Sequence, residues 1–443
     1  MSPILLYPLY ALVLVTVLSV LVAAHEYGHY IFARLFGMGA EEFAIGMGKP
    51  RLITWFRRTY TVPLPADAPY REGEMVEASA AGMNFEKADQ PIRSEVVRTH
   101  KGLALAETTE FTIRPYPVGG FVRIKGMMPE EDGSETKIPG GFYSKPPWQR
   151  FIVLLAGPAF SILAGIFLLT GVLFTQGGID SSEPTIGGVS RTGAARQASL
   201  RPDDKILSID GKPVRRFYDI VSAVRDSPGQ KFLIEFDRAG VRKTTEVVPI
   251  MESSASFVLN EDMEPTGERR LQAKLGIQPF DRRVKMSLAD SFGKAWRAPI
   301  TNVKAIYFTF KRPEQIKENL GGPGSIAATT AMAVDSGFVT VLTFAAMLSI
   351  SVGIFNLLPI FPLDGGQMMV ALAEMLRGGK RLSMRVQNMV GTLGFALVVT
   401  LFVGVLLIDA NRFVFSRFGE AKPAEPKIEM ELSEKMKNMA KED

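Results

Sequence analysis

The sequence predicts an α-helical polytopic membrane protein with about four spans and two sizeable polar regions. Apolar residues make up 47% of the 443 residues, and the mean hydropathy of +0.12 is high for a chain in which 22% of residues are charged. The charges are also unevenly spread, because four runs contain no Asp, Glu, Lys or Arg: 1–24, 151–179, 336–363 and 386–408. About 20 apolar residues suffice to span a bilayer as a helix, so each run is long enough.

These runs divide the chain into segments that we expect in a fixed order. They are a first transmembrane helix over 1–35, a cytoplasmic membrane-associated β region over 36–150 with an insertion at about 61–108, a second transmembrane helix over 151–179, a compact domain over 183–280, an amphipathic membrane-surface helix and connector over 285–335, a third transmembrane helix over 336–366, a fourth over 386–409, and a solvated tail over 410–443.

The first run is expected to stay in the membrane as a helix. A cleaved secretory signal has a basic start and a short apolar core. Here no Lys or Arg precedes Arg34, and the apolar run is too long. The signal-peptide interpretation is therefore disfavoured.

Composition excludes several classes of function. The chain has no cysteine, so disulfides and thiolate metal sites are excluded. The net charge is only +5, and no basic face interleaved with aromatic residues appears, so we expect no nucleic-acid partner.

Basic residues in a short loop predict the orientation of the spans. Arg377, Lys380, Arg381 and Arg385 lie between the third and fourth runs, which places this connection in the cytoplasm. By alternation the β region is cytoplasmic as well, whereas the compact domain and the tail are extracytoplasmic.

Strand signals occur in the first polar region. Short strands are predicted at 43–48 and 111–114, and a further strand at 116–125 is entered through a Gly119-Gly120 bend. The insertion at 61–108 is rich in Ala, Glu, Pro and Met without sustained periodicity, which favours loop with some helix.

The candidate chemistry begins at the end of the first span, with His25-Glu26-Tyr27-Gly28-His29. Residues four apart share a helix face, so both imidazoles can point at one metal ion, and Glu26 can take a proton from an activated water. The alternative is a hydrogen-bonded histidine pair without a metal. Ionisable residues inside a span are costly and usually functional, which favours a zinc site.

A third ligand is needed, since a catalytic zinc has three protein ligands and one open position. A third histidine ligand on the same segment would need glycine at position 32 and histidine at position 35, but these residues are Phe32 and Leu35. The one further histidine, His100, lies in the insertion. A carboxylate from another span is therefore expected. Asp364 follows two prolines and precedes Gly365 and Gly366, which allow close backbone approach; an ordinary helix-ending aspartate is the alternative.

With these motifs the sequence resembles the site-2 proteases, which are intramembrane zinc metalloproteases. The resemblance rests on His25 to His29 and on the stretch from Asn356 to Gly366, with support from Gly119-Gly120-Phe121-Val122, from Ala156-Gly157-Pro158 and from Gly322-Pro323-Gly324. The bacterial regulator-of-sigma-E protease branch is the most similar. The resemblance covers nearly the whole chain except 61–108.

The resemblance implies roles for individual residues. His25, His29 and Asp364 would bind Zn²⁺, and Glu26 would be the general base. Asn356 would hold an unwound substrate backbone, and the strand containing Gly119, Gly120, Phe121 and Val122 would pair with substrate at its edge. The chain departs from the family at Ser161, where asparagine is usual, and Phe361 is bulkier than expected.

The 183–280 region resembles one PDZ module of α/β fold. Its marker is the stretch from Gly193 to Val214 with the turn Asp210-Gly211, and strand-like runs at 205–212 and 231–237 flank a helical pattern at 217–224. The module would bind a peptide or the substrate ectodomain, or serve only as a spacer that excludes bulky ectodomains.

The resemblance implies regulated intramembrane proteolysis in a bacterial inner (cytoplasmic) membrane. The expected partners are the lipid bilayer and single-span membrane proteins, such as a pre-trimmed anti-sigma factor or a remnant signal peptide. Two alternatives remain. One is a membrane-anchored PDZ scaffold with a non-catalytic metal site, and the other is a cytoplasmic-facing membrane zincin that uses a downstream glutamate ligand.

Overall fold

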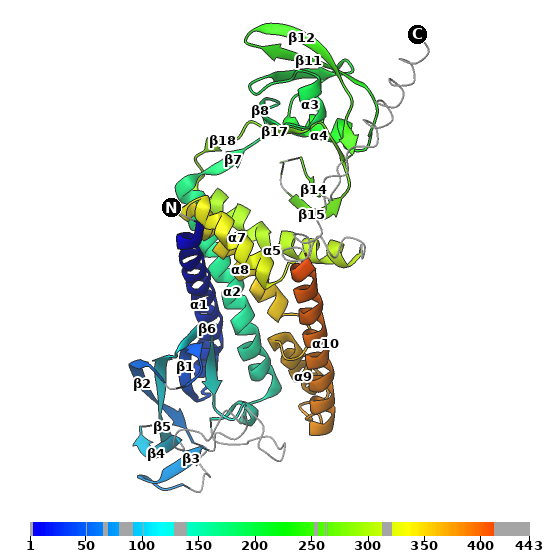
Figure 1. The fold of residues 1–443 in the computed structure, drawn as a ribbon. Coiled ribbons are helices and arrows are strands. Elements are labelled where there is room, and N and C mark those ends of the chain that lie inside the picture. Colours follow the sequence, from blue (N-terminus) through cyan, green and yellow to red (C-terminus); the bar gives the residue numbers. More distant parts are fainter. Residues whose placement is uncertain are drawn as a thin grey trace, which may run out of the picture.

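The computed structural model describes residues 3–49, 51–64, 70–78, 92–100, 102–127, 140–251, 256–261, 263, 265–311 and 321–411. A bundle of helices forms the middle of the molecule, with a six-stranded sheet at one end and a smaller strand-rich module at the other (Figure 1). The solvated tail predicted over 410–443 lies almost entirely outside the described residues.

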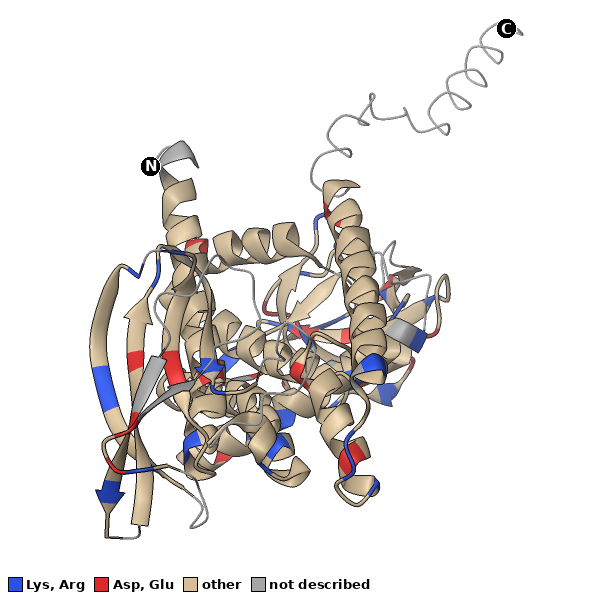
Figure 2. Cartoon of the chain, turned by 90° about the horizontal axis from the view of Figure 1, so that it is seen from below, with Lys and Arg blue, Asp and Glu red and all other residues tan. Residues whose placement is uncertain are grey.

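Within the described residues, four helices are long and apolar enough to cross a membrane. They are α1 (Pro3–Leu35), α2 (Pro147–Gln176), α8 (Phe338–Asn356) and α10 (Met384–Ala410). Charged residues lie mainly on strands and near helix ends, and the helical stretches between are mostly free of them (Figure 2). The prediction of a polytopic membrane protein is confirmed at this level.

Helix α2 is the centre of the bundle. It starts at Pro147, a residue suited to the first helical position because its missing N–H would have no helical partner there. It packs against α1, α8 and two further helices, α5 (Leu288–Lys311) and α9 (Asp364–Leu376). Helix α7 (Pro323–Asp335) contacts α1, α8 and α10.

The six-stranded sheet has the order β3-β4-β5-β1-β6, with β2 also paired to β5. Its strands are β1 (Ala40–Met47), β2 (Ile53–Pro63), β3 (Met75–Ala78), β4 (Ile92–Thr99), β5 (Gly102–Ile113) and β6 (Tyr116–Ile124). The predicted strands at 43–48, 111–114 and 116–125 are confirmed. Strand β6 pairs with β1 and packs against α1, so the sheet touches the helix that carries the two histidines.

The expectation of loop and some helix over 61–108 is wrong where the structure describes this segment. The end of β2, all of β3 and β4, and most of β5 fall in it, and β2 runs antiparallel to β5 from Ile53 to Pro63. The sequence does not predict these strands, because some of their buried positions hold small residues such as Ala104. The alternation of large apolar and polar residues is therefore weak. Pairing with distant strands stabilises them instead.

A buried ion pair joins β1 to Arg114, the residue that follows β5. Arg114 donates from Nη2 to Oε2 of Glu42 over 2.7 Å, and the Thr112 hydroxyl donates to Oε1 over 2.5 Å. Burial acts to raise the pKa of Glu42, but the hydrogen bonds from Arg114 and Thr112 hold that pKa below its usual value. The ionised carboxylate therefore stabilises the pairing of β5 with β1, the strand that also pairs with β6.

The strand-rich module extends from β7 (Gly178–Asp180) to β18 (Arg282–Val284). These first and last strands pair with each other where the chain enters and leaves the module. Its four-stranded sheet has the order β10 (Lys212–Pro213), β9 (Lys205–Ile209), β11 (Phe232–Arg238) and β12 (Val241–Val247). The other elements are β8 (Ile186–Val189), α3 (Ala194–Gln197), α4 (Phe217–Val224), β13 (Ile250–Met251), β14 (Ser256–Leu259), β15 (Pro265–Arg270), β16 (Ala273–Lys274) and β17 (Ile277–Pro279). Ile206, Phe217, Ile220 and Ile234 form its core.

Helix α10 is anchored near its C-terminal end by one buried carboxylate. Asp409 accepts hydrogen bonds from the backbone N–H of Gly324 over 2.8 Å and from the Ser325 hydroxyl over 2.7 Å, at the start of α7. A Cβ at Gly322 would lie 2.6 Å from Oδ2 of Asp409, so the glycine leaves room for the carboxylate. A negative charge is favoured at a helix N-terminus, which explains the contact.

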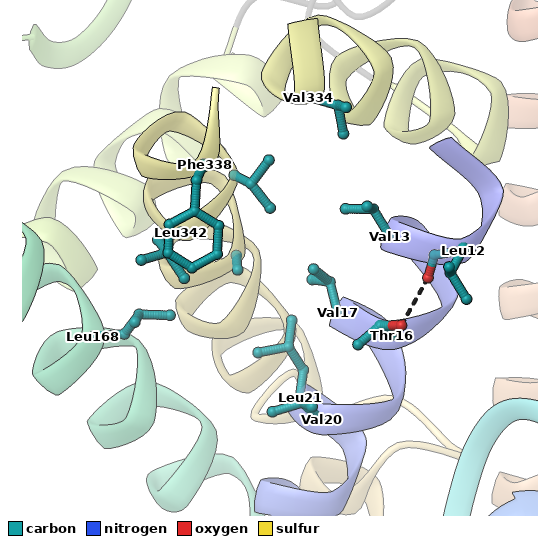
Figure 3. A pocket seen from close by; sticks show the side chains of 12 residues that line it. Leu12, Val13, Thr16, Val17, Val20, Leu21, Leu168, Val334, Phe338 and Leu342 are labelled. Carbon is teal, nitrogen blue, oxygen red and sulfur yellow. Dashed lines mark hydrogen bonds between the residues drawn. The ribbon is translucent and has the colours of Figure 1, made fainter. Parts of the chain in front are cut away.

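An apolar pocket of about 640 Å³ lies between α1, α2, α7 and α8 (Figure 3). Its lining is aliphatic and aromatic except for Thr16, whose hydroxyl donates to the Leu12 carbonyl over 2.8 Å within α1. The pocket therefore suits an apolar occupant and offers no group for proton transfer.

Candidate metal centre

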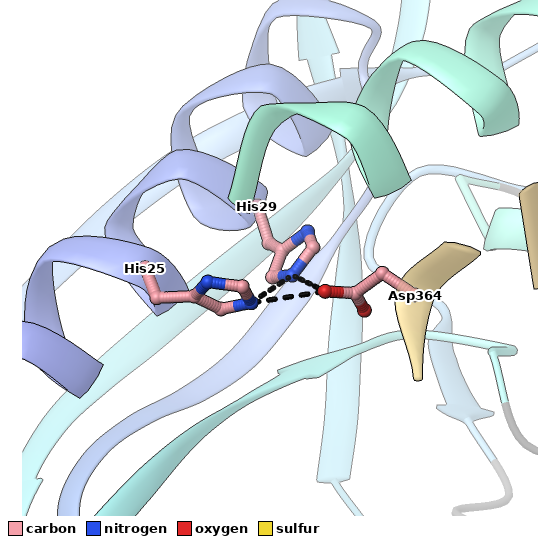
Figure 4. A group of neighbouring side chains, drawn as sticks. All are labelled: His25, His29 and Asp364. Carbon is pink, nitrogen blue, oxygen red and sulfur yellow. Dashed lines mark hydrogen bonds and ion pairs between the residues drawn. The ribbon is translucent and has the colours of Figure 1, made fainter. Parts of the chain in front are cut away.

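Three side chains from two distant parts of the chain meet beside α2 (Figure 4). His25 and His29 lie one turn apart on α1, and Asp364 is the first residue of α9. The two Nε2 atoms are 3.2 Å apart, and Oδ2 of Asp364 is 3.0 Å from His25 Nε2 and 3.4 Å from His29 Nε2. The histidine side chains are 8% exposed and that of Asp364 is 16% exposed, so the cluster is largely shielded from solvent.

The far side of each imidazole ring is held by α2. His29 Nδ1 lies 2.8 Å from the Val153 carbonyl, and His25 Nδ1 lies 2.9 Å from the Ser161 hydroxyl. A carbonyl only accepts, so Nδ1 of His29 carries the hydrogen, and in the neutral ring Nε2 presents a lone pair to the cluster. Lone pairs and a carboxylate that converge in this way match the nitrogen and oxygen ligands of a divalent metal.

Two glycines bring α1 and α2 close enough for these contacts. A Cβ at Gly28 would lie 2.4 Å from the Ala156 carbonyl oxygen, and a Cβ at Gly157 would lie 2.2 Å from His29 Nε2. The positions therefore exclude any larger residue unless a helix or the ring moves. Gly157 in particular forms the space that the His29 ring occupies.

The turn between α8 and α9 delivers Asp364. Helix α8 ends at Asn356, and Asp364 opens α9 after a turn that folds back over the new helix. A Cβ at Gly365 would lie 2.2 Å from the Leu358 carbonyl oxygen, and one at Gly366 would lie 2.7 Å from the Phe361 nitrogen. The predicted role of both glycines in close backbone approach agrees with this packing.

Glu26 follows His25 on α1 and contacts β6. Its Oε2 accepts a hydrogen bond from the backbone N–H of Val122 over 2.9 Å. Gly120, two residues before Val122 on β6, allows close approach to β1, because a Cβ there would be 2.6 Å from the Ala44 carbonyl oxygen. Strand β6 thus orients the carboxylate that the sequence nominates as the base.

The structure also places the residues predicted to bind substrate, and the third histidine of the chain. Asn356 is half-buried at the end of α8, where its Nδ2 donates to the Val352 carbonyl over 3.1 Å. Gly119 has φ of +83°, which favours glycine, and it leads into Phe121 on β6. His100 is exposed at the turn between β4 and β5, so the structure does not bring it into the cluster.

Three positions near the histidines were not assigned a role from sequence. Val153 contacts His29 through its backbone carbonyl, which any residue provides, so the sequence contains no signal for this role. In the sequence, Gly157 stands out only as part of the motif Ala156-Gly157-Pro158. In the sequence, Ser161 stands out only as a departure from the family pattern, although its hydroxyl contacts Nδ1 of His25.

The family profile of peptidase family M50 matches residues 13–65 and 94–401, which is more than half of the chain and includes all three residues of the cluster. The chain belongs to peptidase family M50. The part between the two matched ranges, 66–93, falls within the insertion predicted at about 61–108.

Known proteins similar to this M50 member extend over nearly its full length. A probable protease, eep, of Enterococcus faecalis is 28% identical over 90% of this chain and 98% of the relative. The regulator of sigma-W protease RasP of Bacillus subtilis is 29% identical over 90% of this chain and 97% of the relative. A putative zinc metalloprotease of Brucella suis is 27% identical over 89% of this chain and 92% of the relative. The site-2 protease assignment is confirmed, and the M50 chain is a peptidase.

Proposed function

We propose that this chain is a zinc-dependent intramembrane endopeptidase that cleaves the transmembrane segments of single-span membrane proteins. The observation that carries the proposal is the meeting of His25, His29 and Asp364 through Nε2, Nε2 and Oδ2 on helices of an apolar bundle. Ionisable groups at such a position are expensive unless they are paired or bind an ion, which argues for function.

The cluster fits a zinc ion. Two imidazoles and one carboxylate make a donor set typical of catalytic zinc, and Val153 and Ser161 already hold the outer ring nitrogens. When bound, zinc supplies a Lewis acid that polarises the scissile carbonyl and makes water more acidic. His25, His29 and Asp364 would hold it.

Glu26 would act as general base and then as general acid. A carboxylate takes a proton from the attacking water and returns it to the leaving amine. The hydrogen bond from the Val122 N–H fixes Oε2 and leaves the other carboxylate oxygen to move the proton. Because β6 makes this contact, the strand orients the base.

Substrate would bind along β6 and near Asn356. A helical substrate has its carbonyls bonded within the helix, so it must unwind before cleavage. Gly119, Gly120, Phe121 and Val122 lie on a strand at the edge of its sheet, which suits pairing with an extended peptide. The Asn356 amide offers a donor and an acceptor for the unwound backbone.

The module over 183–280 would be a PDZ domain that binds or excludes substrate ectodomains outside the cell membrane. Its support is the order of strand, helix and strand at 205–209, 217–224 and 232–238. We assign the chain to a bacterial inner (cytoplasmic) membrane and to regulated intramembrane proteolysis. Pre-trimmed anti-sigma factors, in the manner suggested by the relative named for sigma-W, or remnant signal peptides would be its substrates. Membership of the regulator-of-sigma-E branch is part of the same proposal.

The orientation can be tested with reporters fused within the full chain. The module and the basic connection at 377–383 lie at opposite ends of the bundle (Figure 1). We expect a reporter inserted after Pro202 to be extracytoplasmic and one near Gly379 to be cytoplasmic, because basic loops stay inside. Paired alkaline-phosphatase and fluorescent-protein fusions measure this, and the reverse pattern would refute the orientation.

The site itself is tested by replacing Gly157 with alanine. The new methyl group would occupy the space of the His29 ring, so we expect Gly157→Ala to lose bound zinc and cleavage of a single-span substrate. Gly171→Ala on the same helix is the matched control, because a Cβ there has nothing within 4 Å. Zinc content and cleavage of both purified variants are compared with the wild type. Equal zinc and activity in all three proteins would contradict the proposed site.

A further inference from the structure

A fully buried carboxylate lies outside the candidate metal centre. Glu374, near the end of α9, is 0% exposed, and Arg150, in the first turn of α2, is 3% exposed. Nη2 of Arg150 donates to Oε2 of Glu374. Burying either charge without its partner would be strongly unfavourable, so the two residues depend on each other.

The pair links more than two side chains. Oε1 of Glu374 accepts a hydrogen bond from the backbone N–H of Leu382 over 3.2 Å, in the connection that leads to α10. Nε of Arg150 donates to the Lys145 carbonyl over 3.2 Å, just before α2 begins. The guanidinium also lies 5.5 Å from the centre of the Tyr143 ring. Both charged groups are therefore held in fixed directions.

The two helices joined by the pair are those that build the metal centre. Asp364 lies ten residues before Glu374 on α9, which is about 15 Å along a helix. Arg150 lies one turn before Val153 on α2, and Val153 holds His29. Between these points the contact is apolar, with Met368 packed in one cluster with Val153 and Leu154.

Apolar packing alone specifies the position of one helix along another less strictly than directional bonds do. A flexible methionine adapts to several arrangements. A planar guanidinium that bonds a carboxylate through Nη2 and a carbonyl through Nε tolerates little displacement, and buried polar pairs serve to fix register in some proteins. A shift of α9 along α2 would carry Asp364 with it.

We propose that Glu374 and Arg150 are positioning residues that fix the register of α9 against α2 and thereby hold Asp364 in place opposite His25 and His29. The proposal rests on the proposed zinc site, and neither residue touches the metal or substrate. It assigns a role in metal binding to a charged pair at the far end of α9.

Glu374→Gln in the full-length, detergent-purified protein tests the proposal. The amide cannot accept from both Arg150 and Leu382 and leaves the guanidinium without a counter-charge. We expect zinc affinity, measured by competition with a chromogenic chelator, to fall about ten- to a hundredfold, as for other groups that orient metal ligands. We also expect the visible absorption of the Co²⁺-loaded protein to change, because it reports the coordination geometry.

Asp204→Asn is the matched control. Asp204 is 1% exposed in the module and pairs over 2.7 Å with Arg238, which is 23% exposed, so this variant also removes a buried carboxylate from an ion pair, far from α9. We expect it to lower thermal stability but to keep the zinc affinity and Co²⁺ spectrum of the wild type. If Glu374→Gln does not fold, Arg150→Lys serves instead. It keeps the charge and loses the forked donors, and a smaller loss of affinity is expected.

Each other outcome overturns the proposal. Wild-type zinc affinity and Co²⁺ spectrum in the Glu374 or Arg150 variant would show that the pair does not position Asp364. An equal loss in Asp204→Asn would show that general destabilisation weakens metal binding. A wild-type protein that binds no zinc would instead refute the proposed metal site itself, which separates the two failures.

Discussion

Replacing Glu26 with glutamine is expected to abolish cleavage while the protein retains its zinc. Glu26 is not among the three converging ligands, and glutamine preserves the size of the side chain. Its amide cannot take a proton from water, so we expect the rate to fall by at least about 10²- to 10⁴-fold, the usual contribution of a general base. Cleavage of a single-span substrate by purified protein and zinc content by elemental analysis measure the two effects.

Tyr27→Phe is a suitable control for this variant. Tyr27 is the next residue on α1 and is 43% exposed, so it faces away from the cluster, and we expect wild-type cleavage. Cleavage at near the wild-type rate in Glu26→Gln would remove Glu26 from the mechanism. The scaffold alternative makes a different prediction, because a non-catalytic metal site would leave both the wild type and the variant without cleavage.

The membrane helices were predictable from sequence because the signal is local. A run of about 20 predominantly apolar residues without charges is compatible with the bilayer as a helix, whatever the rest of the chain does. The four charge-free runs accordingly coincide with α1, α2, α8 and α10. The sequence did not predict where the third run stops being helical, at Asn356, although Pro359 and Pro362 indicated a break.

The strands of the 61–108 segment were not predictable in the same way. Residues such as Leu105 are buried through pairing with β2 and β4, which lie elsewhere in the chain. A strand of this kind becomes visible only when its partner is known, because the local sequence carries little alternation. The expectation of loop and helix failed for this reason.

In the candidate site, too, some features follow from local sequence and others only from tertiary packing. The spacing of His25 and His29 is a property of one helix, so it was readable from sequence. Val153, Gly157 and Ser161 approach the histidines only because of the rotation of α2 against α1, which no local pattern encodes. Sequence therefore nominated the ligands and the base, while the groups that orient the ligands emerged from packing.

Replacing Asp364 with asparagine tests the pairing of two motifs separated by more than 300 residues. As the third ligand, Asp364 supplies a charged oxygen, and a neutral amide is a poorer ligand for zinc. We expect the zinc affinity of detergent-purified Asp364→Asn to fall by more than about 100-fold, beyond the effect of losing a group that only orients a ligand. Cleavage should be lost with the metal, and His25→Ala should behave in the same way.

The alternative role for Asp364 is to stabilise the start of α9, and it predicts the opposite result. Asparagine caps helices about as well as aspartate, so Asp364→Asn would keep its zinc and activity. The structure already disfavours this role, because the cap position is Leu363 and no side chain caps the helix there. His100→Ala is the control, since His100 is exposed between β4 and β5, and it should leave zinc content unchanged. Full zinc occupancy in Asp364→Asn would refute the three-ligand site, and a loss only in His100→Ala would transfer the third ligand to the sheet.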